Sequence, residues 1–417
     1  MIFSDFGRRY AADTDSGILQ LMQDITAASR QPGVKMLGGG NPALIPEVMH
    51  RFQQRFLQHA ATPAFIDTIG RYSGPGGDAG FIQALAVYFQ GLGWPVEAEH
   101  IALPNGTQNA FFCLFNLFAG QCKGQTQRIL LPLSPEYIGY DGSPIDDSAF
   151  VSRRPQITLL PEQQFKYHLD PAALALEEQR IGAICVSRPT NPTGNVLGDD
   201  EIDILQQQAK AHGIPLIVDN AYGAPFPNII DNDVSTCWQP GMVMCLSLSK
   251  LGLPALRTGI VVADPEIIAA ITAMNAAFNL APTAIGPATL TPMLQDQSLT
   301  QLCQAYIRPF YRDRTATAIA YLHQIAGGLP WRVHKPEGAI FIWLWLEGLP
   351  ISTLALYQRL KAQGLVIVPG EYFFPGLEHD PWEHKSQCIR VSIAQNDAVL
   401  LPGLDILGAE LRRLYQA

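Results

Sequence analysis

A single lysine stands at the end of an apolar run in the segment MCLSLSKLGLPALRTG, residues 244–259. Lys250 follows two serines, and Arg257 comes seven residues later. An amine at the rim of a buried strand can act as a nucleophile or a base, because desolvation lowers the pKa of a lysine. The ordinary explanation for Lys250 is that it lies in a surface loop after a strand. The rest of the chain has to distinguish a surface lysine from a reactive one.

Two other apolar runs also end in polar clusters. DNAYG follows PLIV and contains Asp219 and Tyr222, and SRPTNPTG follows AICV and contains Asn191. Each residue has an ordinary role, the aspartate as a cap or turn former, the tyrosine in packing and the asparagine in a turn. Their chemical roles would be a carboxylate for a cationic ring nitrogen and a phenol for an oxyanion of a ligand.

Further residues are suited to binding a phosphate and a flat ring. Gly106, Thr107 and Gln108 lie at the start of an expected helix, where exposed amides and the helix dipole attract anions. The planar guanidinium of Arg257 is a preferred partner for a phosphate, and Tyr137 could stack on a ring. Alone these signals are weak, because most Gly-Thr pairs only cap a helix and such a tyrosine can belong to the core.

The elements that would position these residues alternate between short apolar runs and helices. We expect strands at the starts of RILLPLSPEY, IGAICVSRPTNPTG, GIPLIVDNAYG and GMVMCLSLSK, and helices at residues 109–120 and 200–213. This alternation predicts an α/β fold with a parallel sheet. Ligands bind outside the carboxyl ends of parallel strands, so the three polar clusters should converge on one site.

The chain length and the later pattern predict two domains. A chain of 417 residues is long for a single core. Residues 287–325 read as long and helical, which could bridge two domains, and residues 338–348 read as a strand. We predict a large α/β domain of residues 46–295, and a smaller α+β domain formed by residues 1–45 and 296–417.

The composition argues against several classes of function. A net charge of −9, without any Lys- or Arg-rich run, argues against nucleic-acid binding. Seven scattered cysteines with no C-x-x-C pair indicate reduced thiols rather than disulfides or a metal site. The N-terminus does not resemble a signal peptide, and no run approaches the roughly 18 apolar residues that span a bilayer. We expect a cytoplasmic protein that binds no metal.

The candidate residues together match the requirements of one ligand, pyridoxal 5′-phosphate. This cofactor needs a lysine for an imine and an acid that keeps its ring nitrogen protonated, which makes the ring an electron sink. Lys250 and Asp219 would supply these two groups. The other contacts would be a phosphate site of Gly106 to Gln108, Ser249 and Arg257, a platform from Tyr137 and a hydroxyl partner from Tyr222.

The order of these motifs resembles that of the fold-type I pyridoxal-phosphate aminotransferases. PTNPTG, then DNAYG, then SLSKLGLPALRTG is the order in that family, and the resemblance runs from LGGGNP at residues 37–42 to the arginine in CIRVSIA. Within the family the match looks closest to the valine–pyruvate aminotransferases, on segments such as PEYIGYDG, FKYH, HKPEGAIF and FFPGL. The resemblance implies a large domain with a mainly parallel seven-stranded sheet flanked by helices, and a smaller α+β domain.

The resemblance also implies roles for individual residues. Lys250 would form the Schiff base and carry the proton, with Asp219 on the ring nitrogen and Tyr222 on the ring hydroxyl. Arg390, with Gly40 and Asn191, would bind the substrate α-carboxylate. The remaining cofactor contacts would come from Gly106, Thr107, Gln108, Tyr137, Asn191, Ser247, Ser249 and Arg257, and from Tyr72 of the partner subunit in a homodimer.

The implied reaction is a ping-pong transamination between a small aliphatic amino acid and a 2-oxo acid. Its best match is L-valine plus pyruvate giving 3-methyl-2-oxobutanoate and L-alanine. Two alternatives stay open, namely another enzyme on the same scaffold, such as a different aminotransferase, a β-lyase or a decarboxylase, and a sensor protein that binds the cofactor. The segment SGILQLMQD, residues 16–24, is a candidate for a cover over the active site.

Overall fold

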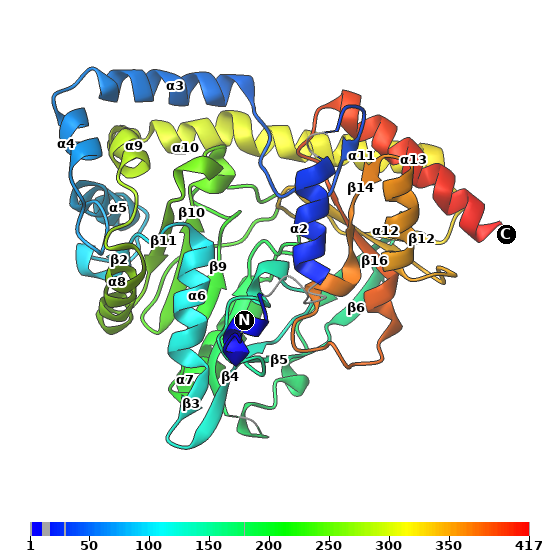
Figure 1. Ribbon diagram of the computed structural model, residues 1–417, viewed down its shortest axis with the longest axis horizontal. Helices are drawn as coiled ribbons and strands as arrows, with labels where there is room; N and C mark the ends of the chain where they lie inside the picture. Colours follow the sequence, from blue (N-terminus) through cyan, green and yellow to red (C-terminus); the bar gives the residue numbers. More distant parts are fainter. Residues whose placement is uncertain (1, 11–16, 29–30, 179, 417) are drawn as a thin grey trace.

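The computed structural model describes residues 2–10, 17–28, 31–178 and 180–416. These residues form an eight-stranded, a six-stranded and a two-stranded sheet, with helices packed against them (Figure 1). In the described ranges, none of the helices has the length and apolar character needed to cross a membrane.

The eight-stranded sheet is mainly parallel, as predicted. Its order is β2-β11-β10-β9-β8-β4-β3, with β5 also paired to β4. Only β11 and β3 run against the common direction in this sheet. The predicted number of seven strands is one short, because the short polar strand β3 extends the sheet as a hairpin partner of β4. The strands are β2 (Ile101–Ala102), β3 (Gly120–Cys122), β4 (Gln125–Leu131), β5 (Phe150–Ser152), β8 (Ile181–Ser187), β9 (Leu216–Asp219), β10 (Met242–Ser247) and β11 (Gly259–Val262).

Helices cover both faces of this sheet because its strands are apolar on both sides. Ile217 belongs to a core with residues of α6 (Thr107–Phe118) and α8 (Pro265–Asn279). Its neighbours Leu216 and Val218 belong to another core, which includes residues of α5 (Ala79–Gly91) and α7 (Asp199–His212). Successive side chains of a strand point to opposite faces, so continuous burial of a strand requires a layer on each side.

The six-stranded sheet joins two distant parts of the chain. Its order is β15-β16-β13-β12-β7-β6. The strands are β6 (Gln156–Leu160), β7 (Gln164–His168), β12 (Trp331–His334), β13 (Phe341–Leu346), β15 (Val368–Pro369) and β16 (Cys388–Ser392). Strands β6 and β7 come from within residues 46–295, yet β7 pairs in parallel with β12. The boundaries of the two domains stay a prediction, and the sheet pairing cuts across the division at residue 295.

The helical region predicted over residues 287–325 is interrupted. Helix α9 (Ile285–Gln295) ends before Gln297, whose φ of 58° lies in the left-handed region. Helix α10 (Ser298–Leu302) then leads through a π-helical turn (Cys303–Ile307) into α11 (Arg308–Ala326). The remaining elements are α1 (Asp5–Arg8), α2 (Gly17–Ala28), α3 (Pro46–Ala60), α4 (Ala64–Gly70), α12 (Thr353–Ala362), α13 (Asp397–Tyr415), and the two-stranded sheet of β1 (Lys35–Met36) with β14 (Leu365–Val366).

Candidate active site

The three polar clusters meet at the carboxyl edge of the eight-stranded sheet. Asp219 at the end of β9 pairs in register with Ser187 on one side and with Cys245 on the other. Three loops leave this edge, and we call them the asparagine loop (residues 188–198), the tyrosine loop (220–232) and the lysine loop (248–258). Their convergence follows from the parallel pairing of β8, β9 and β10.

The surroundings of the Lys250 amine lower its pKa. Its Nζ donates a hydrogen bond of 2.9 Å to the carbonyl oxygen of Gly40 and lies 5.2 Å from the ring centroid of Tyr222. Burial and the charge of Arg390, aided by Arg257 and opposed by Asp219, lower the pKa of this amine to about 8. A lysine with a pKa in this range can hold or release a proton near neutral pH.

The carboxylate of Asp219 is buried and firmly oriented. Oδ2 accepts a hydrogen bond of 2.9 Å from the hydroxyl of Tyr140, and Oδ1 accepts one of 3.0 Å from the amide of Ala221. Burial raises the pKa of Asp219 to about 6, although these two bonds and Lys250 act to lower it. The group can therefore be an anion at neutral pH in a site with little water, which suits pairing with a cationic ring nitrogen.

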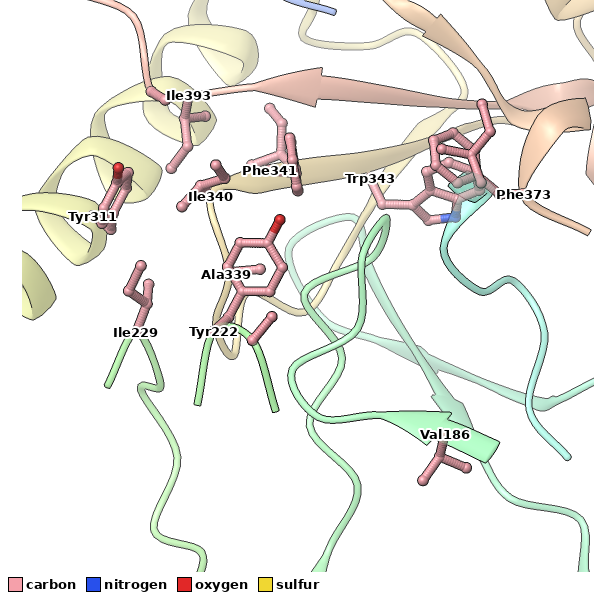
Figure 2. Close-up of a cluster of buried hydrophobic side chains, with 14 of the residues drawn as sticks. Val186, Tyr222, Ile229, Tyr311, Ala339, Ile340, Phe341, Trp343, Phe373 and Ile393 are labelled. Atoms are coloured by element: carbon pink, nitrogen blue, oxygen red, sulfur yellow. The ribbon is translucent and has the colours of Figure 1, made fainter. Parts of the chain in front are cut away.

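Two tyrosines lie near these groups. Tyr222 is buried, and Figure 2 shows its ring beside Ala339, near the segment of Ile340 and Phe341 that leads into β13. The centroids of the Tyr222 and Phe341 rings are 6.1 Å apart. Tyr137 is half-buried and contacts Tyr140 edge to face, with centroids 5.4 Å apart. Burial raises the pKa of both phenols, so both are neutral hydrogen-bond donors.

Gly106 and Arg257 form the core of a candidate phosphate site. Gly106 precedes α6 with a φ of 84°, and no side chain caps the first turn of this helix. A side chain at position 106 would clash with the guanidinium of Arg257. Arg257 is exposed, and in the described part of the chain it makes no ion pair, since its recorded partners are two carbonyl oxygens. Uncapped amides beside an unpaired guanidinium make a site for a dianion.

The residues next to this phosphate site differ in which of their hydrogen-bonding groups are already bonded within the protein. Ser249 is buried at the start of the lysine loop, and its amide donates a hydrogen bond of 3.1 Å to the hydroxyl of Ser247. The side chain of Gln108 instead donates to the carbonyl oxygen of Gly139, at 2.7 Å, and to Ser143. Gln108 can therefore contribute its backbone amide at the start of α6, like Thr107, and its side chain is already bonded elsewhere.

Arg390 on β16 is a buried cation without an acidic partner among the described residues. Its Nη1 donates to Oδ1 of Asn191 at 2.8 Å, its Nη2 donates to the carbonyl oxygen of Gly38 at 2.9 Å, and its Nε has no hydrogen-bond partner. Its guanidinium carbon lies 4.1 Å from the ring centroid of Phe341 and 5.1 Å from that of Phe373. Burial lowers the pKa of Arg390 to about 10. A buried charge left unpaired is costly, so this arrangement indicates an anionic ligand.

The glycine segment contributes two neighbouring carbonyl groups to the site. The carbonyl oxygen of Gly40, a predicted substrate contact, accepts a hydrogen bond from Lys250, whereas that of Gly38 accepts one from Arg390. A side chain at position 38 would crowd the backbone of Ile367, while one at position 40 would meet nothing within 4 Å. The open side of Gly40 leaves room for a ligand beside Lys250.

Two further predicted features are Tyr72 and the segment of residues 16–24. Tyr72 is 83% exposed in the irregular stretch after α4, where it is free to contact another subunit. In the segment 16–24, residue 16 lies outside the described residues, and the remainder belongs to α2. Asp24 of α2 accepts a hydrogen bond from Tyr357 of α12 at 2.7 Å, so this helix is attached to α12.

Sequence reasoning missed two acidic or phenolic neighbours of Asp219. Tyr140, three residues after Tyr137 in the same segment, donates to the Asp219 carboxylate. Glu136 is buried and accepts hydrogen bonds from the amide, at 3.0 Å, and the hydroxyl of Ser187. Burial raises the pKa of Glu136 to about 8, with Asp219 adding to the rise. Both lie in SPEYIGYDG, whose polar residues followed a strand and were a usable signal.

The fold and this arrangement of groups define an aminotransferase. Residues 35–402 match the family described as aminotransferase class I and II, and the chain belongs to that family. It is 47% identical over 417 residues to the valine–pyruvate aminotransferase of Escherichia coli K12, covering 100% of this chain and 99% of that protein. The predicted family and fold type are confirmed.

Solved structures give the same result. The valine–pyruvate aminotransferase of Salmonella typhimurium LT2 is 47% identical, with a TM-score of 0.89, over 96% of this chain and 100% of that one. A mutant aspartate aminotransferase from Thermus thermophilus is 20% identical, with a TM-score of 0.77, over 98% and 99% of the two chains. At that identity the second likeness shows the fold alone.

Enzymes of this family use pyridoxal phosphate, and the residues present fit that cofactor. The guanidinium of Arg257 lies against Gly106, where a Cβ would clash with it, and among the described residues it has no acidic partner. An amine of lowered pKa and a buried carboxylate lie at the ends of neighbouring strands. The set therefore offers a group for each end of the cofactor, the phosphate, the aldehyde and the ring nitrogen.

Proposed function

We propose that this protein transfers an amino group between a small aliphatic amino acid and a 2-oxo acid, with pyridoxal 5′-phosphate as cofactor. The preferred pair is L-valine with pyruvate, giving 3-methyl-2-oxobutanoate and L-alanine. Full-length identity of 47% to a valine–pyruvate aminotransferase supports this choice of substrates.

The main geometric support for the proposal is the spacing between Arg390 and Lys250. The segment of residues 38–40 accepts a hydrogen bond from Arg390 at Gly38 and another from Lys250 at Gly40. Two residues of extended chain span at most about 7 Å. The cation suited to a carboxylate and the reactive amine are therefore held on one short segment. This spacing suits an α-amino acid, whose carboxylate and α-carbon are directly bonded.

The residues would divide the work as follows. Asp219 would pair with the ring nitrogen, and Tyr222 and Asn191 would hydrogen-bond the ring hydroxyl. Tyr137 would lie against the ring, and the phosphate would be held by Gly106, Thr107, the backbone of Gln108, Ser247, Ser249 and Arg257. When bound, the cofactor withdraws electrons from the substrate carbon that carries the amino group.

Lys250 is the residue placed to move the proton. Its amine, with a pKa of about 8, can take a proton from the substrate α-carbon and return it, so it serves as base and then as acid. Arg390, with Asn191 beside it, would bind the α-carboxylate with its planar fork. This contact would fix the α-carbon with respect to Lys250, which reduces the entropy cost of the proton transfer.

The surroundings of Lys250 support a substrate with an uncharged side chain. The cations that bear on its amine are Arg390 and Arg257, which are assigned above to a carboxylate and a phosphate. Tyr222, whose ring centroid lies 5.2 Å from this amine, has the apolar neighbours Ala339, Ile340 and Phe341 (Figure 2). A second carboxylate would lose its water in such a place without gaining a cation from these residues.

We also propose that the active protein is a homodimer in which Tyr72 reaches the phosphate site of the partner subunit. Helix α4 buries none of its residues in this chain, and Ile66 and Ile69 are 67% and 59% exposed. Exposed apolar residues beside Tyr72 suit a contact with a second copy. A cytoplasmic location is supported by seven cysteines that are all unpaired.

Complementation tests the shared site. Mixed dimers of Lys250→Ala and Tyr72→Ala chains contain one site with both defects and one with neither, if Tyr72 acts across the interface. We expect mixing the two purified variants under exchange conditions to restore activity. Continued inactivity of verified mixed dimers would show that Tyr72 serves its own subunit or neither.

The reaction itself is tested with purified holoenzyme, L-valine and pyruvate. We expect alanine and 3-methyl-2-oxobutanoate to form in equal amounts, and each amino acid alone to change the cofactor spectrum in a half-reaction. Repeated turnovers that release ammonia from an amino acid without an oxo-acid acceptor would instead favour a lyase, because a half-reaction yields at most one oxo acid per site and no ammonia. A panel of other amino acids would rank the donors.

A further inference from the structure

The buried carboxylate of Glu337 joins the asparagine loop, which carries Asn191, to the tyrosine loop, which carries Tyr222. Glu337 lies in the hairpin loop between β12 and β13, residues 335–340, and its side chain is 2% exposed. It forms ion pairs with Lys166 of β7 and with Lys335, the latter at 3.0 Å. None of these residues belongs to the catalytic groups assigned above.

Glu337 is bonded to the asparagine loop. Its Oε2 accepts a hydrogen bond of 3.1 Å from the amide of Val196, and the same oxygen pairs with Lys166. Lys166 in turn donates to Oδ1 of Asn195 at 3.2 Å and to the carbonyl oxygen of Val196 at 3.1 Å. The amide of Thr190 donates to Asn195, which closes the turn that contains Asn191.

The same carboxylate is bonded to the tyrosine loop. Its Oε1 accepts from the side chain of Asn232 at 3.3 Å, and the carbonyl oxygen of Glu337 accepts from the amide of Asp231 at 2.8 Å. Further along, the amide of Ala339 donates a hydrogen bond to the carbonyl oxygen of Ile229. The amide of Ile229 in turn donates to the carbonyl oxygen of Tyr222. These bonds tie the hairpin loop to the segment that follows Tyr222.

The hairpin loop, the asparagine loop and the tyrosine loop are in close contact as well as hydrogen-bonded. A Cβ on Gly338 would lie 2.6 Å from the carbonyl oxygen of Ile229 and 2.7 Å from the ring of Pro189. A Cβ on Gly194 would lie 2.6 Å from the carbonyl oxygen of Gly338. The hairpin loop thus fits between the other two, with little room to move.

The hairpin loop leads directly to the surroundings of Arg390. Phe341 follows it, and the guanidinium carbon of Arg390 lies 4.1 Å from the Phe341 ring centroid. Asn191 bonds the same guanidinium from the asparagine loop. A displacement of Glu337 would therefore move two groups that contact Arg390, Asn191 in the asparagine loop and Phe341 at the start of β13.

We propose that Glu337 is a positioning residue for the substrate-carboxylate site, acting through Asn191 and Phe341 on the orientation of Arg390. This inference rests on the proposed role of Arg390. Lys166 and Lys335 supply the opposite charge, so the carboxylate has partners on both oxygens and can bear burial. The arrangement holds loops of the eight-stranded sheet against a loop of the six-stranded sheet.

The test compares Glu337→Gln with wild-type holoenzyme, using two probes that separate the ends of the substrate. The first probe is 3-methylbutanoate, which has the valine skeleton and carboxylate but no amine. The second is 2-methylpropylamine, which has the amine but no carboxylate. We expect Glu337→Gln to weaken the binding of 3-methylbutanoate and to raise the KM for valine, each on the order of tenfold, as for the loss of one charged hydrogen bond. Binding of 2-methylpropylamine and of the cofactor should change less than twofold.

Glu347→Gln is the matched control. Glu347 follows β13 at its opposite end and pairs with Arg332 at 2.7 Å, and its recorded contacts include none of the three loops. We expect this variant to bind both probes like wild type. If Glu337→Gln weakened both probes equally, or neither, the positioning role would be wrong.

A second variant covers the case in which Glu337→Gln does not fold. Asn232→Ala removes one bond between Glu337 and the tyrosine loop but keeps the ion pairs, and should weaken 3-methylbutanoate selectively by about threefold. Unchanged binding of that probe would oppose the proposal. If wild-type protein itself bound no 3-methylbutanoate, the proposed role of Arg390 would be at fault, and with it the proposed function.

Discussion

The hydroxyl of Tyr140 donates a hydrogen bond of 2.9 Å to the carboxylate of Asp219, at the end of the central strand β9. The ring of Tyr140 is fully buried against Phe111 and Phe115 of α6, with centroids 4.8 Å and 5.2 Å away. The phenol therefore has one fixed direction. It stabilises the charged form of an acid whose pKa burial would otherwise raise further.

We predict that Tyr140→Phe shifts the acid limb of the pH profile for kcat to higher pH. Loss of this hydrogen bond raises the pKa of Asp219 above about 6, so more of the acid is protonated at neutral pH and cannot pair with the ring nitrogen. We expect kcat at pH 7 to fall by roughly ten- to a hundredfold, as for a hydrogen bond to a charged group. The measurement is a pH profile together with the spectrum of the bound cofactor.

Tyr88→Phe is the control for loss of a tyrosine hydroxyl. Tyr88 shares a hydrogen bond of 2.6 Å with Thr300, between α5 and α10. Its profile should match wild type. An acid limb in Tyr140→Phe that coincides with wild type would contradict the assigned role.

Gly106→Ala should abolish tight cofactor binding. The new Cβ would require a strained φ near 84° and would press on the guanidinium of Arg257. Gly93→Ala imposes a similar strain, at a φ of 85°, but its Cβ would meet nothing within 4 Å. We expect the Kd for pyridoxal phosphate to rise at least about tenfold in the first variant and to stay near wild type in the second. Equal effects would mean that backbone strain alone is responsible.

The rate at which apoprotein takes up pyridoxal phosphate should depend on the protonation of Lys250. The neutral amine is the reactive form, and its pKa is about 8, so the rate should rise as pH increases and level off above that value. Stopped-flow absorbance would measure it. Lys250→Arg keeps the charge but should show no such rise, no covalent attachment after borohydride reduction and no turnover. Turnover at the wild-type rate by this variant would refute the mechanism.

Arg390→Lys should weaken substrate binding while leaving cofactor binding intact. A lysine keeps the charge but loses the planar fork and the bonds to Asn191 and Gly38. We expect a loss of about 2–5 kcal/mol in the affinity for valine. Arg359→Lys, at an ion pair with the buried carboxylate of Glu410, is the control. Calorimetry with 3-methylbutanoate would detect the change without turnover, and unchanged affinity would remove Arg390 from the carboxylate site.

The candidate site was predictable where strand ends carry the information. Lys250, Asp219 and Asn191 each follow an apolar run, and parallel pairing necessarily brings such ends to one edge. Arg390 could be placed only through the family resemblance, because it lies 140 residues after Lys250 and in another sheet. The predicted contact of Gln108 with the phosphate did not specify backbone or side chain, and in the structure the side chain donates to Gly139 and Ser143.

The sequence by itself determined the family, the α/β class and the order of the chemical groups, because these depend on residue types and on local periodicity. The tertiary structure decided which neighbours those groups have. Tyr140 rather than Tyr137 bonds Asp219, and Gly38 and Gly40 divide between Arg390 and Lys250. It also placed β6 and β7 beside the C-terminal strands. Such contacts depend on strand register and packing across distant segments, which no local pattern encodes.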